Sequence, residues 1–282
     1  NMNYLVTLTK TFTFDAYKKI NFLCAGARGN GKSYGTLILI AELSSLPRLD
    51  KNQLLGTGQL PTQIYCVDFK NSDIARLAKF LPAGRVATNK NEAIKVVEEY
   101  DQKMHQRLDF IKTQNFGSTA GTLGMPMYYL IIDEWSATNA SFNQGITKED
   151  KALRYKWNAL ITDIAMLNRI PGFGLGIISQ QISVIGSGLS TSVQEEAGLK
   201  LHFGSANMSS YRLTFGNDIQ IPEMNLETGE AYAWIEGLTS AGYVIPFAMP
   251  KIEPDKLWNY LRQSLSHTQD DEKYLFFTSK GQ

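Results

Sequence analysis

Residues 26–33 read GARGNGKS, and their types and spacing are the part of the chain that most directly indicates chemistry. They match the pattern G-x-x-x-x-G-K-[ST], in which a glycine-rich loop points successive backbone N–H groups at phosphate oxygens. An apolar strand precedes the loop and an apolar helix follows it, as the motif requires. We therefore predict a P-loop that binds ATP and is built from Gly26, Ala27, Arg28, Gly29, Asn30, Gly31, Lys32, Ser33 and Tyr34.

The second candidate segment, YYLIIDEW at residues 128–135, supplies the groups that hydrolysis needs. Lys32 would reach the β- and γ-phosphates, and Ser33 and Asp133 would hold Mg²⁺. Glu134 is the candidate general base that orients and deprotonates the attacking water. Acidic residues often begin loops, but an Asp-Glu pair that ends a buried strand downstream of a complete P-loop favours the catalytic interpretation.

A third strand, GLGIISQQ, ends in Gln180, whose amide could bond both the γ-phosphate and the lytic water. The plainer alternative is a polar strand end that faces solvent. Cys24 and Cys66 lie in apolar runs, and the three histidines show no metal-ligand spacing, so a zinc site is not expected. Apart from Mg²⁺, we therefore expect no metal.

Composition narrows the class of protein further. The 282 residues carry 28 basic and 27 acidic side chains, a net charge of +1, which argues against coating of nucleic acid by bulk electrostatics. No apolar run reaches the length of a membrane span, and no signal peptide is evident. We expect a cytoplasmic protein, which membrane-anchored transfer or secretion partners could hold at the membrane.

Apolar runs alternate with helical patterns, which is typical of a sheet with crossover helices. The fold class expected is α/β: a RecA-like P-loop NTPase with a mostly parallel sheet flanked by helices and a C-terminal β-hairpin. The expected strands are 20–25, 64–68, 128–133, 175–179 and 199–203, the hairpin strands are 231–236 and 243–247, and the helices are 32–43, 91–112, 151–167 and 253–264.

We divide the chain into three parts. Residues 1–17 are expected to form a lead-in strand or extension, and residues 18–265 the ATPase domain. Residues 266–282 are polar and charged except for the cluster 274–277, and are expected to form a mobile tail or a docking arm.

The order of these segments resembles the FtsK/SpoIIIE–HerA superfamily of motor ATPases, and within it the coupling proteins of Gram-positive conjugative elements. The likeness covers roughly residues 18–250. In chain order, it is carried by GARGNGKSYGTL, YCVDFKNSDIARL, KMHQR, YYLIIDEW, MLNRIPGFGLGIISQQ and LKLHFGSANMSSYRLTFG. The departures are Asp68-Phe69-Lys70, where the family has D-P-K, and Gln181-Ile182, where it has R-P.

This resemblance implies a homo-oligomeric ring, a hexamer, that threads DNA through its pore without reading its sequence. It also implies that Gln180 senses the γ-phosphate and that an arginine from the neighbouring subunit completes each ATP site. Arg107 is the expected arginine, and Arg169 and Arg212 are its rivals. The family's membrane helices and DNA-reading winged helix are not in this sequence, so it is either a motor domain from a longer protein or a small member that depends on partners.

The function expected is an ATP hydrolase that translocates DNA, serving conjugative transfer of a mobile element. A protein-secretion motor and a phage genome-packaging or assembly ATPase are the alternatives. A local basic stripe is expected to contact DNA phosphates; this stripe consists of Lys148, Lys151, Arg154 and Lys156. The alternative interpretation is that these side chains form a solvated helix face. Strandedness of the DNA and direction of movement stay undetermined.

Overall fold

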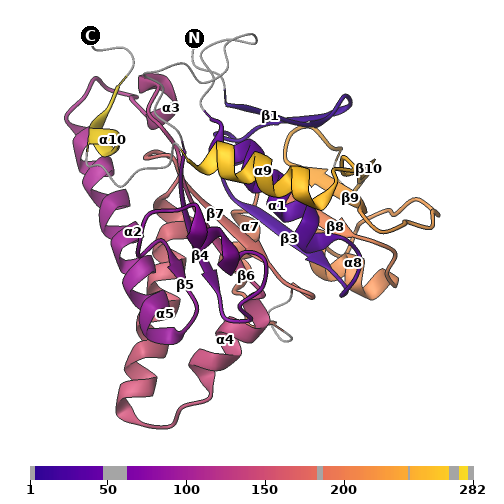
Figure 1. Cartoon of the computed structure of the whole chain (residues 1–282), viewed down its shortest axis with the longest axis horizontal. Coiled ribbons are helices and arrows are strands. Elements are labelled where there is room, and N and C mark those ends of the chain that lie inside the picture. Colours follow the sequence, from indigo (N-terminus) through magenta and orange to yellow (C-terminus); the bar gives the residue numbers. More distant parts are fainter. Residues whose placement is uncertain (1–3, 47–61, 183–186, 241, 267–272, 279–282) are drawn as a thin grey trace.

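An eight-stranded sheet forms the centre of the protein (Figure 1). Its strand order is β10-β9-β8-β3-β7-β6-β4-β5; all neighbours from β8 to β5 are parallel, and β9 and β10 are antiparallel. The strands are β3 (Phe22–Gly26), β4 (Gln63–Asp68), β5 (Val86–Ala87), β6 (Tyr128–Asp133), β7 (Phe173–Ile178), β8 (Leu199–Phe203), β9 (Glu230–Ile235) and β10 (Ile245–Ala248). The computed structural model describes residues 4–46, 62–182, 187–240, 242–266 and 273–278.

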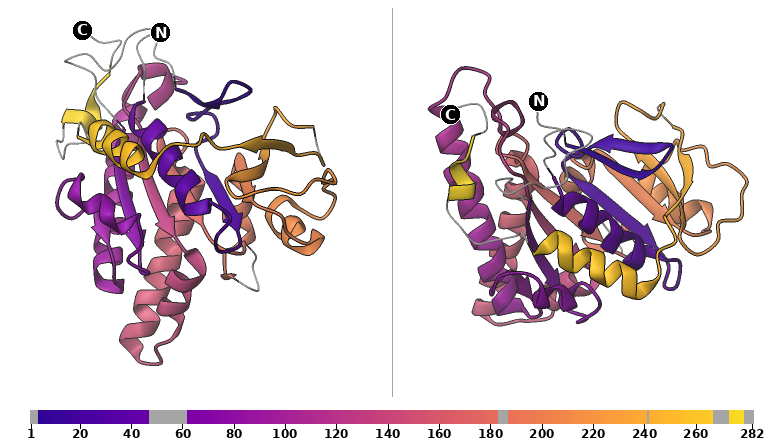
Figure 2. Two further views of the ribbon diagram at one scale, coloured as in Figure 1. Left: turned by 45° about the vertical axis from the view of Figure 1, so that its right-hand side comes forward. Right: turned by 45° about the horizontal axis from the view of Figure 1, so that its top comes forward.

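Helices cover both faces of this sheet (Figures 1 and 2). One face carries α1 (Lys32–Ser44), η1 (Ala75–Lys79) and α9 (Pro254–Leu265). The other carries α2 (Lys90–Lys112), α4 (Trp135–Asn143), α5 (Lys148–Leu167) and α7 (Thr191–Glu195). The remaining short helices are α3 (Ala120–Leu123), α8 (Met208–Phe215) and α10 (Lys273–Phe276). None of the described helices is both long and apolar enough to cross a bilayer.

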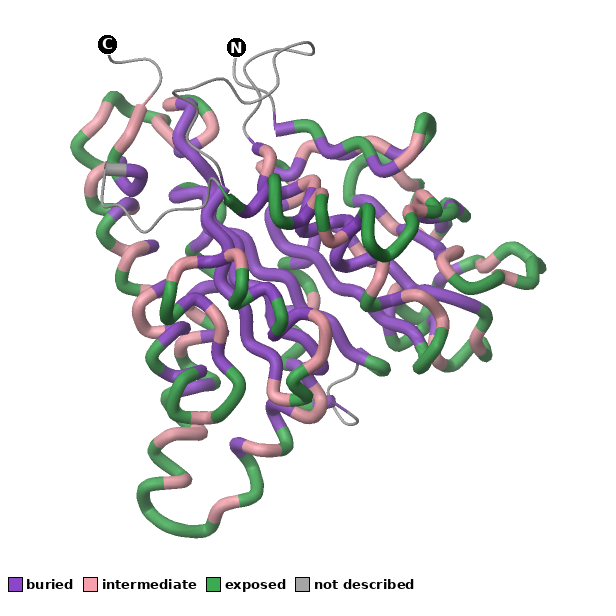
Figure 3. The backbone as a smooth tube through the Cα atoms, viewed as in Figure 1, coloured by how far each residue is buried: buried purple, intermediate pink, exposed green. Residues whose placement is uncertain are grey.

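Covering both faces explains the continuous apolar strands of the sequence, because parallel strands sandwiched between helices have no solvated side. Every residue of β4, β6 and β7 is buried, and Figure 3 shows the strands as a buried centre inside an exposed shell. The predicted α/β fold and its mostly parallel sheet are therefore confirmed. The predicted C-terminal hairpin corresponds to β9 and β10.

Besides the short helices η1, α3, α7, α8 and α10, which were not among the expected helices, α5 and α4 differ from expectation. Helix α5 begins three residues earlier than predicted because Thr147 and Asp150 form a capping box at its N-terminus. Helix α4 was not expected, since its sequence WSATNASFN has little apolar periodicity, and it begins directly after Glu134. We refer to α4 and α5 together as the α4–α5 arm. The loop that joins them and the first turns of α5 project beyond the sheet (Figures 1 and 2), whereas Trp157, Ile161 and Ile164 pack the rest of α5 against it.

The N-terminal segment forms two strands where one was expected. β1 (Leu5–Thr9) and β2 (Phe12–Asp15) pair as an antiparallel two-stranded sheet. Their buried side chains belong to the same hydrophobic core as α1 and α9, and the ring of Phe12 stacks on Phe247 at 4.4 Å between centroids. The segment is thus packed on the ATPase fold, which gives it a structural role.

Candidate active site

The P-loop joins β3 to the start of α1, at the carboxyl edge of the sheet. Gly31 has φ 84°, and a Cβ at this position would lie 2.7 Å from the backbone nitrogen of Gly229. Only glycine fits both the left-handed conformation and this close approach. Because Gly31 is the N-cap of α1, the free N–H groups of the first turn point at the loop, which is the arrangement that binds phosphate.

The loop is held from behind by the neighbouring strands. The Asn30 side-chain amide donates to the Phe203 carbonyl at the end of β8 (3.2 Å). The Gly229 N–H donates to the Asn30 carbonyl (3.1 Å), and the Thr228 hydroxyl to the Gly29 carbonyl (3.4 Å). These bonds use the side chain of Asn30 and the carbonyls of Gly29 and Asn30. Within the loop, the Asn30 N–H donates to the Ala27 carbonyl (3.4 Å).

The parallel pairing of β4 and β6 brings two carboxylates together at the same edge. Asp68 and Asp133 are register partners at the ends of these strands, and both are buried. The Ser72 hydroxyl lies 2.7 Å from Asp68 Oδ2 and 2.9 Å from Asp133 Oδ2, so it bridges the two acids. The backbone N–H groups of Ser72 and Ala75 also donate to Asp68 Oδ2.

This environment raises the pKa of Asp133, first through burial and then through the charge of Asp68. A divalent cation placed here would offset both effects, and carboxylate and hydroxyl oxygens are the ligands that Mg²⁺ prefers. Asp133 and the exposed hydroxyl of Ser33, on the first turn of α1, therefore fit the predicted Mg²⁺ site. Magnesium would neutralise charge on the phosphates.

Glu134 lies between the P-loop and two strand ends. It is one of two non-glycine residues with positive φ in the described chain (48°), and its carboxylate is nearly buried. Its Oε2 lies 3.8 Å from the Nζ of Lys32 and 2.9 Å from that of Lys70. Its Oε1 accepts the backbone N–H of Gln180 at 3.3 Å. The structure thus brings Lys32, Glu134 and Gln180 together, although the side chain of Gln180 is exposed and its sensor role stays a prediction.

Sequence reasoning missed three residues of this site: Asp68, Lys70 and Ser72. The sequence does contain a signal for Asp68. Two of the expected parallel strands end in aspartate, and the carboxyl ends of parallel strands lie at the same edge of the sheet. No local pattern assigns Lys70 or Ser72. Their contacts with Glu134 and Asp133 depend on which strands are neighbours.

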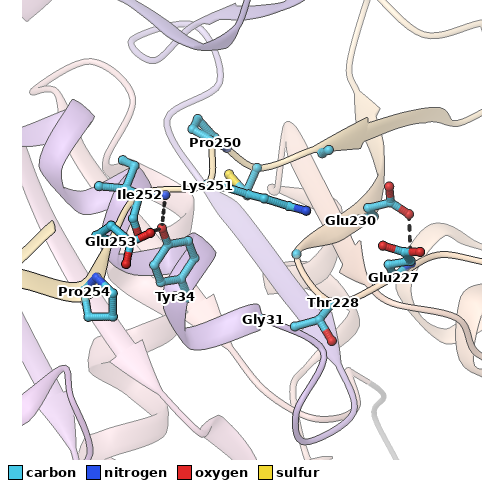
Figure 4. A pocket seen from close by; sticks show the side chains of 13 residues that line it. Gly31, Tyr34, Glu227, Thr228, Glu230, Pro250, Lys251, Ile252, Glu253 and Pro254 are labelled. Carbon is cyan, nitrogen blue, oxygen red and sulfur yellow. Dashed lines mark hydrogen bonds between the residues drawn. The ribbon is translucent and has the colours of Figure 1, made fainter. Parts of the chain in front are cut away.

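A pocket of about 320 Å³ adjoins the P-loop on the side of α1 (Figure 4). Tyr34 forms one wall, where its hydroxyl bonds the backbone carbonyl and N–H of Ile252. Glu227 and Glu230 lie on the opposite side in Figure 4, and Gly31 connects the pocket to the loop. Lys251 extends toward these carboxylates in Figure 4, so the pocket combines an aromatic wall with groups of both charges. The aromatic wall suits a planar heterocycle.

The structure corrects the expectation for Arg107. Its side chain is fully buried on the inner face of α2, where the guanidinium lies over the rings of Tyr128 and Phe173. It donates to four carbonyl oxygens, those of Pro126, Pro171, Tyr274 and Leu275. Burial lowers the pKa of Arg107 to about 10, which still leaves it charged at neutral pH. A guanidinium enclosed in this way cannot reach a neighbouring subunit's nucleotide.

The same contacts show what the cluster at 274–277 does. Tyr274 and Leu275 are buried in α10, and Arg107 bonds both of their carbonyls at 2.8 Å. Residues 273–276 therefore pack on α2 of the same chain, and the role of the tail as a docking arm stays a prediction. Residues 267–272 and 279–282 lie outside the described part of the chain.

Arg107→Ala should consequently destabilise the fold instead of affecting catalysis selectively. Removal leaves four buried carbonyls without their charged donor, so we expect a loss of about 3 kcal/mol or more of unfolding free energy. That corresponds to a melting temperature lower by about 6–12 °C for a domain of this size. Lys112→Ala, on the exposed end of the same helix, is the matched control. Unchanged melting with reduced turnover would contradict the structural role.

Comparison with known proteins agrees with this geometry. The Bacillus subtilis FtsK domain-containing protein YdcQ is 24% identical over 252 residues, which are 88% of this chain and 46% of the relative. The chain thus spans about half the length of that relative. No family model matches.

Solved structures support the same fold. The pCW3 conjugation coupling protein TcpA, solved with ATPγS, superposes with a TM-score of 0.65 and 19% identity, over 92% of this chain and 69% of TcpA. EssC from Geobacillus thermodenitrificans (ATPases 2 and 3) gives 0.64 and 13%, over 94% of this chain and 46% of that one. The likeness to FtsK-type ATPases predicted from the motifs is confirmed: the chain is similar in sequence to an FtsK domain-containing protein, and its fold is that of the TcpA and EssC ATPase domains.

Proposed function

We propose that the chain is the ATP-hydrolysing motor of a DNA-transfer system, working as a homo-oligomeric ring. The observation that carries the catalytic part is the convergence of Lys32, Asp133 and Glu134 at one sheet edge. Lys32 and the α1 N-terminus would bind the β- and γ-phosphates, and Ser33 and Asp133 would hold Mg²⁺. Glu134 would take the proton of the attacking water. The pocket beside Tyr34 would receive the nucleoside base.

The α4–α5 arm supports DNA as the substrate. Along α5, the exposed residues Lys148, Lys151 and Tyr155 recur at helical spacing, and the guanidinium of Arg154 lies 5.6 Å from the Tyr155 ring centroid. Lysines that contact phosphates next to an exposed aromatic ring suit a nucleic acid bound without sequence preference. Lys156 forms an ion pair with Glu98 on α2, so we do not include Lys156 among the proposed contacts with DNA.

A protein-secretion motor is the second candidate. The Thermomonospora curvata Type VII secretion ATPase EccC also superposes, with a TM-score of 0.59 against 0.65 for the coupling protein TcpA, so the fold does not distinguish transfer of DNA from secretion. Glu149, Asp150 and Asp163 offset most of the positive charge of α5 as a whole. The exposed Lys148, Lys151 and Tyr155 nevertheless favour DNA. The coupling-protein assignment within the superfamily rests on this surface and on the motif order of the sequence.

The deciding experiment measures ATP turnover with double-stranded DNA, with single-stranded DNA and without DNA. We expect stimulation by one form of DNA, and a steep loss of that stimulation with added salt because phosphate contacts release counterions. Replacing Lys148 and Lys151 together by alanine should weaken the DNA effect and reduce the slope of log affinity against log salt by about 2.

The matched control is the double replacement of Lys95 and Lys112 by alanine, which removes the same charge from the exposed side of α2. It should leave the salt slope unchanged. If neither form of DNA changed the rate of ATP turnover, DNA would be rejected as the substrate and the secretion alternative would be favoured. The ATPase assignment would stand.

A further inference from the structure

Lys70 is the closest described cation to the candidate base, yet the proposed reaction gives it no part. Its Nζ lies 2.9 Å from Glu134 Oε2, whereas the Nζ of Lys32 lies 3.8 Å from the same oxygen. The side chain of Glu134 is 9% exposed and that of Lys70 is 45% exposed. An ammonium bonded to a carboxylate stabilises its charge and occupies a lone pair that a water proton would need.

The two lysines differ in what else they can do. Lys32 is nearly buried at the start of α1, where the phosphates of ATP are proposed to bind, so phosphate would draw its ammonium away from Glu134. Lys70 follows β4, outside the P-loop, and would remain on the carboxylate. Because nearly half of it is accessible, its flexible side chain can leave for solvent or for an anionic partner.

The backbone around Lys70 is fixed. Its N–H donates to Asp68 Oδ1 at 3.0 Å, and its neighbour Phe69 packs against Phe142 of α4 with 6.0 Å between ring centroids. Since α4 begins directly after Glu134, the α4–α5 arm contacts both sides of the Lys70–Glu134 pair. A shift of that arm would change the distance between the ammonium and the carboxylate.

We propose that Lys70 is a positioning residue that restrains Glu134 and keeps hydrolysis slow until the α4–α5 arm engages its substrate. This inference rests on the proposed function, in which Glu134 is the base and the arm meets the substrate. Breaking the Lys70–Glu134 pair frees the carboxylate for the lytic water. Engagement of the arm and loss of the Lys70 charge should therefore have the same effect on turnover.

The test compares Lys70→Met, which keeps the length of the side chain without its charge, with Lys70→Arg, which keeps the charge. Lys79→Met, on the exposed side of η1, is the control. The measurement is kcat and KM for MgATP without any substrate for the arm. Lys70→Met should raise basal kcat about tenfold, the effect of losing one charge-assisted hydrogen bond from the resting state only. KM should change less than about twofold.

Lys70→Arg and Lys79→Met should behave as the unmodified chain does. A lower kcat in Lys70→Met would overturn the proposal, because Lys70 would then hold Glu134 in its productive position. An unchanged kcat would overturn it equally. The combination Lys70→Met with Glu134→Gln separates this idea from the proposed function: it should be as inactive as Glu134→Gln alone, and activity there would mean that Glu134 is not the base.

Discussion

Glu134→Gln should bind ATP with nearly normal affinity and lose its turnover by about 10²–10⁴-fold, the usual contribution of a general base. Glutamine keeps the size of the side chain, but its single amide oxygen can replace only one of the two carboxylate oxygens that accept from the Gln180 N–H and the Lys70 ammonium. An amide cannot take a proton from water. Steady-state phosphate release and the fluorescence of a labelled ATP analogue would measure the two quantities separately.

Lys32→Ala provides the contrast, because it should remove ATP binding itself. The Lys32 ammonium is the charge that the motif places on the β- and γ-phosphates. A Glu134→Gln protein with unchanged turnover would show that another group activates the water. Ser136, whose hydroxyl lies 2.7 Å from that of Ser179 at the edge of the site, serves as a control: Ser136→Ala should change neither binding nor turnover by more than a few-fold.

The second large effect follows from the proposed ring, in which a neighbouring subunit would supply an arginine to each ATP site. With Arg107 buried, Arg169 and Arg212 remain, and both are exposed. We test Arg212 first, which lies exposed on α8. Arg212→Ala should leave ATP binding intact and reduce turnover by roughly 10³–10⁵-fold, the effect of such arginines in well-studied systems. The same change at Arg169 should have a small effect.

Mixing variants tests whether the arginine acts between subunits. A Glu134→Gln subunit retains Arg212, and an Arg212→Ala subunit retains Glu134, so their shared interface would rebuild one complete site. Turnover should therefore partly return when the two inactive proteins are mixed and shown by light scattering to assemble together. Co-assembly without any recovery would exclude Arg212 and return attention to Arg169.

Local sequence determined the P-loop and the ends of the central strands. Gly31 is required by a backbone with positive φ and by the close approach of Gly229. The continuous apolar runs that become β4, β6 and β7 required burial on both faces. Because such requirements act within a few residues, the pattern predicted Lys32, Asp133 and Glu134 at one edge of an α/β sheet.

For Arg107, the helical spacing in the sequence and the family resemblance led to opposite predictions. It lies three residues after Met104 and four before Ile111, both of which are buried on α2. That spacing places the arginine on the inner face of the helix. What the spacing alone does not supply is the set of carbonyls that make burial of a charge tolerable, and two of these come from residues 274 and 275.

Only the tertiary structure determined the contacts that control the candidate base. Lys70 and Glu134 are far apart in sequence, and they meet because β4 lies directly beside β6 in the sheet. Ser72 bridges Asp68 and Asp133 for the same reason. Strand order depends on how the crossover helices pack on the sheet. That packing must bury the apolar faces of all elements and allow the chain to connect them. The sequence therefore determined which groups could do the chemistry, and the packing of distant segments determined which cations and hydroxyls restrain them.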